Sequence, residues 1–216
     1  MAFFVCLAGI LGAASARPMP VQELVRLVEG RYRSAETLET QFLERYSENG
    51  RLVRVESGKA YFRRPGKMRW EYESPESKMF LSDGKKVWFY VPSDHTVMRS
   101  AVKDSSDWRT PFLLLVRKPR FSDLCKGIAL GQPGEALSGD AVIHCSPRGA
   151  GAGDEILFEV KSSTGDLTRV LIREAGGVEI DFRFGEWVRN PALPAMTFEF
   201  RPPMGTAIVD SEPPLK

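Results

Sequence analysis

The 216-residue chain has the length of one large or two small globular domains. Hydrophobic residues make up 43% and charged residues 27%, which is ordinary for a globular protein. A formal net charge of +2 is too small to indicate nucleic-acid binding, and no basic run interleaved with aromatic residues follows a helical pattern. We therefore expect no nucleic-acid partner.

The chain begins with an apolar stretch that closes in Ala14-Ser15-Ala16, the small-residue pattern of a signal-peptide cleavage site. We interpret residues 1–16 as a cleaved secretory signal peptide, too short for a permanent membrane anchor, and residues 17–216 as the mature domain. Cys6 lies within the apolar run, but the residues before it do not form a lipoprotein acylation box. The mature protein is therefore expected to be exported and unlipidated.

The first half of the mature chain predicts one helix followed by β-hairpins. Between Val21 and Tyr32, apolar residues recur at three- and four-residue spacing, which indicates an amphipathic helix. From Leu38 to Tyr46 the apolar period changes to two, which is typical of a strand, and Asn49-Gly50 is a strong hairpin signal. Further strands are predicted at residues 51–63, 68–72, 79–81, 86–91 and 96–100.

A second helix is predicted from Thr110-Pro111, a favourable cap and first helical residue, to Val116. Its apolar run has to be covered on most sides, and Pro119 ends it. Strands then follow at residues 128–130, 141–145, 155–161, 167–174, 178–184 and 196–201. About ten strands and two short helices predict one mainly β (α+β) domain, a strongly curved antiparallel sheet with the helices covering one side.

The aromatic, methionine and leucine residues of these segments could line an apolar wall between sheet and helices. The candidates are Leu24, Leu27, Phe42, Met68, Trp70, Met79, Leu81, Phe89, Phe112, Leu113 and Leu114. An ordinary filled core is the alternative interpretation, because apolar stripes usually just pack together.

Two cysteines remain after cleavage of the predicted signal peptide, Cys125 and Cys145. In an oxidising compartment an even number favours a disulfide, which for a loop of this size contributes about 3 kcal/mol. Two free buried thiols are the alternative.

Little in the sequence indicates an enzyme. Ser93-Asp94-His95 has the residue types of a hydrolytic triad, but adjacent residues cannot adopt the triad geometry. His144-Cys145 offers two metal-ligand types without a second pair at suitable spacing. We therefore expect no catalytic residues, metal or cofactor, and a secreted hydrolase that depends on His95 is the alternative.

Four motifs, taken together, resemble one family. They are GKAYFRRPGKMRWEY at residues 58–72, SDGKKVWFYVP at 82–92, TPFLLLVRKP at 110–119 and FEFRPPMG at 198–205. In this order and at these distances they are similar to the periplasmic lipoprotein carriers of the LolA family, over nearly the whole mature chain. The resemblance implies an open half-barrel whose concave face is covered by a helical lid and holds the acyl chains of lipoproteins.

The resemblance also implies a role for Arg64, which precedes Pro65: it would hydrogen-bond to the lid and keep it shut in the cargo-free protein. The expected function is that of a monomeric carrier in the periplasm. It would take acylated lipoproteins from an ATP-driven transporter of the inner membrane and yield them to an acceptor lipoprotein of the outer membrane. The alternative on the same scaffold is a glycolipid-binding or envelope-stress sensor module.

Overall fold

The computed structural model describes residues 19–102, 112–117, 120–138 and 141–210, and the predicted signal peptide lies outside them. In this part of the chain the helices are α1 (Val21–Arg33), α2 (Leu113–Val116) and α3 (Phe121–Leu124), with 3-10 turns η1 (Pro92–Asp94) and η2 (Ala195–Phe198). The strands are β1 (Thr37–Glu48), β2 (Arg51–Arg63), β3 (Lys67–Ser74), β4 (Lys78–Asp83), β5 (Lys86–Val91), β6 (Thr96–Ala101), β7 (Cys125–Leu130), β8 (Ala141–Pro147), β9 (Glu155–Val160), β10 (Leu167–Arg173), β11 (Val178–Phe184), β12 (Val188–Arg189) and β13 (Ala207–Asp210).

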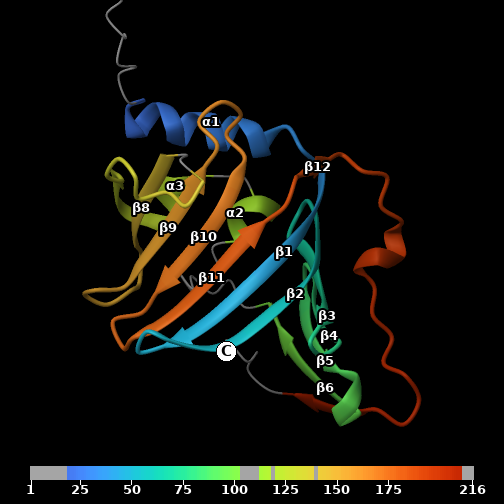
Figure 1. The fold of residues 1–216 in the computed structure, drawn as a ribbon. Helices are drawn as coiled ribbons and strands as arrows, with labels where there is room; N and C mark the ends of the chain where they lie inside the picture. Colours follow the sequence, from blue (N-terminus) through green and yellow to red (C-terminus); the bar gives the residue numbers. More distant parts are fainter. Residues whose placement is uncertain (1–18, 103–111, 118–119, 139–140, 211–216) are drawn as a thin grey trace, which may run out of the picture.

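One sheet contains all of these strands. Its order is β13-β6-β5-β4-β3-β2-β1-β11-β10-β9-β8-β7, and β12 pairs with β1 off this path. The pairings are antiparallel except that of β13 with β6. The order ends at β13 and β7, so the sheet is open, and it curves around the helices (Figure 1). This confirms the predicted class, a mainly β open half-barrel with helices on its concave face.

Two meanders build the sheet. β1 to β6 pair in chain order, β7 to β11 do likewise, and the pairing of β1 with β11 joins the two halves. The predicted turn at Asn49-Gly50 is confirmed, with φ of 50° and 76° at its two residues. Positive φ at both central positions is what a type I′ hairpin requires, and asparagine and glycine are the residues that tolerate it best.

The core lies between the concave face and the helices. α1 buries Leu24, Val28 and Tyr32, a stripe at four-residue spacing, as its amphipathic pattern predicts. α1 crosses one end of the strands, while α2 and α3 lie within the curve of the sheet (Figure 1). None of the helices that the structure describes is long and apolar enough to cross a bilayer.

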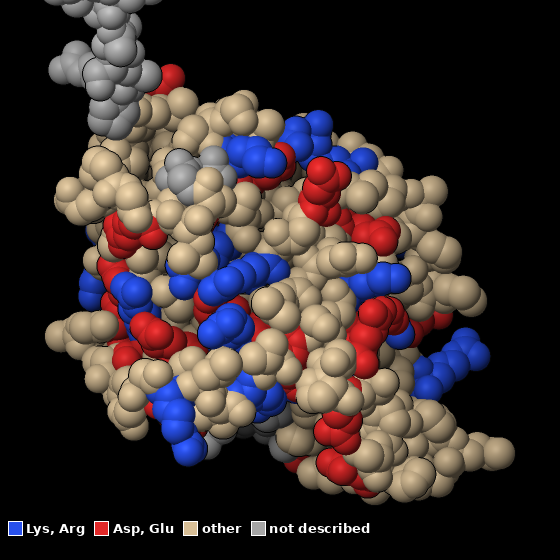
Figure 2. Space-filling view, in the orientation of Figure 1, with Lys and Arg blue, Asp and Glu red and all other residues tan. Residues whose placement is uncertain are grey.

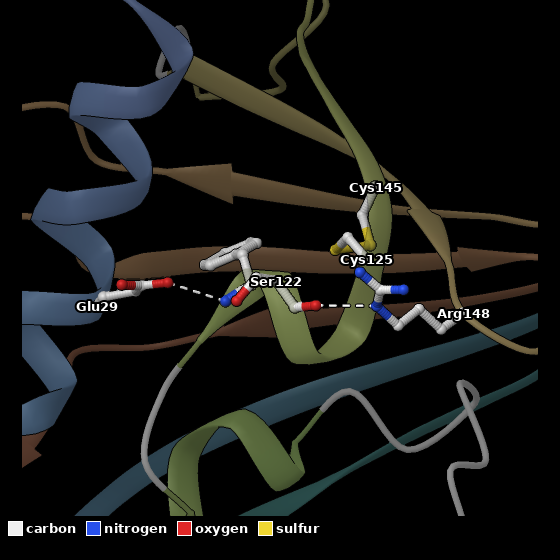
Figure 3. The surroundings of a disulfide bond; sticks show 6 residues. Glu29, Ser122, Cys125, Cys145 and Arg148 are labelled. Carbon is white, nitrogen blue, oxygen red and sulfur yellow. Dashed lines mark hydrogen bonds between the residues drawn. A yellow bond between two sulfur atoms is a disulfide. The ribbon is translucent and has the colours of Figure 1, made fainter.

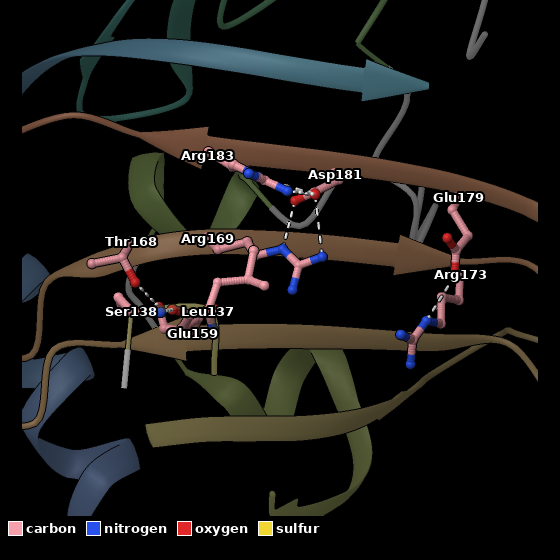
Figure 4. A network of polar contacts seen from close by, with 9 residues as sticks. All are labelled: Leu137, Ser138, Glu159, Thr168, Arg169, Arg173, Glu179, Asp181 and Arg183. Atoms are coloured by element: carbon pink, nitrogen blue, oxygen red, sulfur yellow. Dashed lines mark hydrogen bonds and ion pairs between the residues drawn. The ribbon is translucent and has the colours of Figure 1, made fainter. Parts of the chain in front are cut away.

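The convex face is polar and carries both signs of charge. Asp181 on β11 accepts two hydrogen bonds from Arg169, at 2.6 and 3.1 Å, and two from Arg183, at 3.2 and 3.0 Å (Figure 4). The buried carboxylate of Glu159 accepts from the backbone N–H groups of Leu137 and Ser138 and so fixes that loop on β9. Basic and acidic side chains are interspersed over this side (Figure 2), so neither sign dominates it.

The C-terminal segment differs from the prediction. Residues 196–201 do not form the last strand: η2 takes their place, and the last strand is β13, which pairs in parallel with β6. Four prolines surround η2, at positions 191, 194, 202 and 203, and each lacks the N–H that a strand ladder needs. The segment instead crosses the convex face, where Phe200 contacts the rings of Trp88 and Tyr90 at 5.7 and 5.3 Å.

The second predicted helix is shorter in the structure than expected. α2 spans Leu113–Val116, and the predicted start at Thr110-Pro111 lies outside the described residues. The short turn expected at residues 121–124 is α3, and it leads directly into β7.

Candidate functional site

Aromatic rings line the concave face where β1, β2 and β3 lie side by side. Trp70 is at their centre, with ring centroids of Phe42 at 4.9 Å and Phe62 at 5.6 Å. The cross-strand partners of Trp70 and Tyr72 on β2 are small, Ala60 and Gly58. Small residues opposite large ones leave room for the rings to stand on the sheet, so the strands themselves build an apolar wall.

Phe112, just before α2, inserts into this wall from the helix side. Its ring centroid lies 4.7 Å from that of Trp70, 4.8 Å from Phe182 and 6.0 Å from Phe184. The side chain is only 9% exposed. We call α1, α2 and Phe112, which cover the concave face, the lid. One ring from the lid therefore occupies the middle of the concave face and contacts strands of both sheet halves.

Arg64, in the β2–β3 turn, joins both parts of the lid to the rim of the sheet. Its Nη1 donates to the carbonyl oxygen of Arg33 at 2.8 Å and its Nη2 to that of Tyr32 at 2.5 Å, both at the end of α1. Its Nε donates to the carbonyl oxygen of Leu115 in α2 at 3.3 Å. Burial, and secondarily the charge of Arg33, lower the pKa of Arg64. All three acceptors are backbone carbonyls at helix ends, and that of Tyr32 also accepts from the Ala35 N–H at 3.2 Å.

Six of the residues expected in the apolar wall lie in one buried cluster. They are Leu24, Phe42, Met68, Trp70, Phe112 and Leu114. Leu27 is half-buried on α1 and rests against Gly165 of the β9–β10 turn. Phe89 pairs with Phe80 and so shares its inward face, but it is only partly buried. Leu113 begins α2, and its side chain lies outside the described part of the structure.

Met79 and Leu81 do not face the concave side, so their assignment to the wall is wrong. Their partners on β3 are Glu71 and Arg69, and directly paired residues share a face. Both are buried nevertheless, because η2 lies against β3 and β4 on the convex side. Phe80, which pairs with Trp70, has the inward position.

A buried polar cluster, missed in the sequence, lies on the concave face beyond the aromatic rings. Glu44 and Glu56 are paired residues, 7% and 4% exposed. Tyr72 donates its hydroxyl to Glu44 at 2.8 Å, and Lys78 lies 2.6 Å from a Glu56 oxygen. Arg54 Nε lies 2.8 Å from the other Glu56 oxygen. The period of two from Leu38 through Phe42 puts position 44 on the inner face, which is the signal that could have found it.

The pKa values of two members of this cluster, Glu44 and Tyr72, are raised. Burial is the main cause that raises the pKa of Glu44; the hydrogen bond from Tyr72 opposes the shift, and the charge of Glu56 adds to it. Burial likewise raises the pKa of Tyr72 well above its usual value, and the neighbouring Glu44 adds to the effect. The apolar wall therefore ends, away from α1, in a layer of paired charges.

A disulfide lies directly after α3. Cys125 and Cys145, whose Cα atoms are 5.4 Å apart, are bonded and join the start of β7 to β8 (Figure 3). The backbone N–H of Phe121 donates to Glu29 of α1 at 2.9 Å, and Arg148 Nε donates to the carbonyl oxygen of Ser122 at 2.9 Å. α3 is thus attached to α1, to β8 and to the residue that follows β8.

The two histidines lie in a turn and between two carboxylates. His95 is a turn residue with φ of 48°, and the Ser93 hydroxyl donates to Glu76 at 2.5 Å, with Asp94 Oδ1 at 3.2 Å. His144 lies between Glu135 and Glu155, at 2.8 and 2.5 Å, on the convex side. Among the described residues, no group of three or more His, Cys, Asp or Glu side chains could hold a metal ion.

Comparisons with known proteins agree with this architecture. The family model for the outer membrane lipoprotein carrier protein LolA matches residues 33–201. The outer-membrane lipoprotein carrier protein of Dechloromonas aromatica (strain RCB) is 34% identical over 179 residues, 82% of this chain and 83% of that protein. That of Xanthomonas axonopodis pv. citri (strain 306) is 28% identical over 210 residues, 95% of each.

Solved structures share the fold of this chain. An uncharacterized conserved protein from Thermus thermophilus has a TM-score of 0.55 at 15% identity, covering 88% of this chain and 99% of that one. MucB has a TM-score of 0.50 at 14% identity, covering 83% of this chain and 62% of that one. At these identities the likeness concerns the fold alone.

The polar cluster makes stability depend on pH. Because folding raises the pKa of Glu44 above its ordinary value of 4.5, the native state binds more protons, and the free energy of unfolding falls as pH rises through this window. Glu44→Gln keeps an acceptor for Tyr72 but removes the buried charge. We expect it to raise the free energy of unfolding, relative to the wild type, more at pH 7 than at pH 4, measured by urea denaturation.

Glu48→Gln is the matched control, because Glu48 accepts a hydroxyl hydrogen bond from Tyr46 at 2.9 Å but is exposed. A gain for Glu44→Gln that is the same at both pH values would contradict the assigned origin of the shift.

Proposed function

The chain belongs to the LolA family of outer-membrane lipoprotein carriers, and we propose that it carries acylated lipoproteins through the periplasm from the inner to the outer membrane. A carrier moves its cargo without chemical conversion, so the chain is not an enzyme. The acyl chains bind between the concave face and the helices. An ATP-driven transporter supplies the cargo and an outer-membrane lipoprotein accepts it. Residues 1–16 direct export and residues 17–216 form the carrier.

The cover of the aromatic concave face is the main support for this proposal. Its cover is Phe112 and two helices, and polar contacts from Arg64 to three carbonyl oxygens fasten both helices to the rim. A cover of this kind can separate from the sheet without breaking a covalent bond. The charged residues beyond Tyr72 limit the apolar surface at the other end.

The energies are compatible with opening by cargo. Each hydrogen bond from a charged donor contributes roughly 1.5–3 kcal/mol, so the three from Arg64 contribute on the order of 5 kcal/mol. Removing a palmitoyl-sized chain from water gains about 0.8 kcal/mol per methylene, on the order of 10 kcal/mol in total. The apolar gain exceeds the loss of the latch, while the difference stays small enough for release to an acceptor.

The cargo itself is tested by purification from the periplasm of a host that depends on this protein. We expect acylated lipoproteins to copurify and to be identified by mass spectrometry, because only a covered apolar site keeps their tails in solution. The control is a host that lacks the gene. In this host, lipoproteins should accumulate in the inner membrane. Copurification of a glycolipid or of a regulatory protein, without acylated lipoprotein, would contradict the proposed function and favour the alternative module.

Arg64→Leu tests the latch. Without the hydrogen bond to Leu115 the empty closed form loses stability relative to the loaded form, so the variant should accept cargo but transfer it at least about tenfold more slowly, since about 1.4 kcal/mol corresponds to tenfold. The measurement is the rate of lipoprotein transfer from purified carrier to acceptor. Arg63→Leu is the matched control, because the Arg63 side chain lies over the ring of Phe198 instead. Equal rates in Arg64→Leu and wild type would refute the latch.

Phe112→Ala tests the place of binding. Loss of the ring removes roughly 3–5 kcal/mol of packing from the closed form and leaves space beside Trp70. We expect a fluorescent fatty acid to bind this variant about tenfold more tightly. Phe121→Ala is the control, because Phe121 is likewise buried but packs on Phe158 at 5.0 Å. A similar gain in both variants would indicate general loosening and not a site at Trp70.

A further inference from the structure

The end of α1 is fastened on two sides, and Arg64 accounts for one of them. The second side is the β9–β10 turn, residues 161–166, which lies against the same helical turn. The contacts of this turn with α1 are a paired charge, a buried hydrogen bond and a close backbone approach.

The paired charge joins Arg31 to Asp166. Arg31 Nε lies 2.5 Å from Oδ1 and Nη2 lies 2.9 Å from Oδ2, so the pair is bidentate. The side chains are only 22% and 17% exposed. The Thr164 hydroxyl donates to the same carboxylate at 2.8 Å and fixes its orientation. Bidentate, half-shielded pairs hold geometry better than single surface contacts.

The buried hydrogen bond joins Leu167 to Tyr32. The β9–β10 register shifts between Leu167 and Arg169, and side chains pair with the backbone groups of Leu167 at this point. Its N–H donates to the Tyr32 hydroxyl at 2.9 Å, and its carbonyl oxygen accepts from Trp187 Nε1 at 2.7 Å. The Tyr32 and Trp187 rings meet edge to face at 5.5 Å. Tyr32 is fully buried, so this contact is shielded from water.

The close approach is at Gly165. Its φ of +78° favours glycine, and a Cβ built there would lie 2.9 Å from the carbonyl oxygen of Leu27. The backbone of α1 therefore rests directly on the turn.

The α2 part of the lid has different contacts with the sheet. Its carbonyl groups accept from Arg64 Nε, at 3.3 Å to Leu115, and from the Gly66 N–H, at 2.9 Å to Val116. The Phe112 ring packs among aromatic side chains, and Leu114, Leu115 and Val116 are buried in the core. Residues 112–116 are all apolar, so this stretch has no side chain that could form an ion pair with the sheet as Arg31 does with the β9–β10 turn.

We propose that Arg31, Tyr32 and Asp166 are positioning residues that keep α1 on the sheet while cargo binds, so that the lid opens at α2. This assignment rests on the proposed carrier function. α1 is then the fixed wall of the acyl site, and Arg64 keeps its contacts with α1 while it releases Leu115. Acyl chains enter where Phe112 leaves.

Two backbone amides report on the two parts of the lid. The Gly66 amide bonds to α2 and the Leu167 amide bonds to α1. Their hydrogen exchange is measured by NMR on the full mature protein, free and with a synthetic dipalmitoylated lipopeptide. We expect the protection of Gly66 to fall about tenfold on binding and that of Leu167 to stay within about twofold, because only α2 leaves the sheet.

Asp166→Asn tests the anchor directly, and Arg31→Gln removes the same pair from the other side. Both should raise exchange at Leu167 about tenfold in the free protein and weaken lipopeptide binding, since the fixed wall is lost. Asp210→Asn is the matched control: Asp210 forms a bidentate pair with Arg99, at 2.7 and 2.8 Å, far from α1. It should leave both quantities unchanged.

Lipopeptide binding that removes the protection of Leu167 would overturn this division of the lid and leave the carrier function standing. Tighter binding by Asp166→Asn would do the same, because it would show that α1 has to move. A wild-type protein that binds no lipopeptide would overturn the carrier function, and this assignment with it.

Discussion

Carbonyl groups at helix ends, which lack a partner within the helix, are the constraint on which this structure depends. The last carbonyls of a helix have no partner within it and carry its negative dipole end, so they attract a cationic donor. Arg64 meets this need for α1 and for α2 with one guanidinium. In the proposed opening at α2, closing the lid and completing the end of that helix are therefore the same event. When the lid opens, water can replace the donor, which keeps the cost of opening moderate.

The two faces of the sheet are covered by different parts of the chain. This difference explains for which residues the sequence could predict the face. Strict alternation, as in β1 and β3, predicted the inward positions of Phe42, Met68 and Trp70 correctly. β4 carries three consecutive apolar residues, Met79, Phe80 and Leu81, so alternation cannot choose a face. Pairing with Trp70 makes the choice for Phe80, and the C-terminal segment then covers the other two.

Hairpins were predictable because their signals are local, whereas long-range pairings were not. The turn at Asn49-Gly50 is specified by two residues. The parallel pairing of β13 with β6 joins Ala207 to Thr96, and no local pattern encodes such a contact. The same holds for the site: Arg64 was found through its motif, but Asp166 became visible only when folding brought the β9–β10 turn beneath Arg31.

A carrier of acyl chains must stay folded when it is empty, and an empty apolar cavity destabilises a protein in proportion to its volume, by about 24 cal/mol per Å³. This chain avoids the penalty by filling its concave face with a ring from its own lid, Phe112 against Trp70 and Phe182. In the proposed carrier, loading exchanges one apolar occupant for another, so the net free energy is a difference between two similar terms. With such a small difference, modest contacts such as those of Arg64 can set the direction of transfer. A filled interior in the cargo-free state is thus what reversible binding of a lipid tail requires.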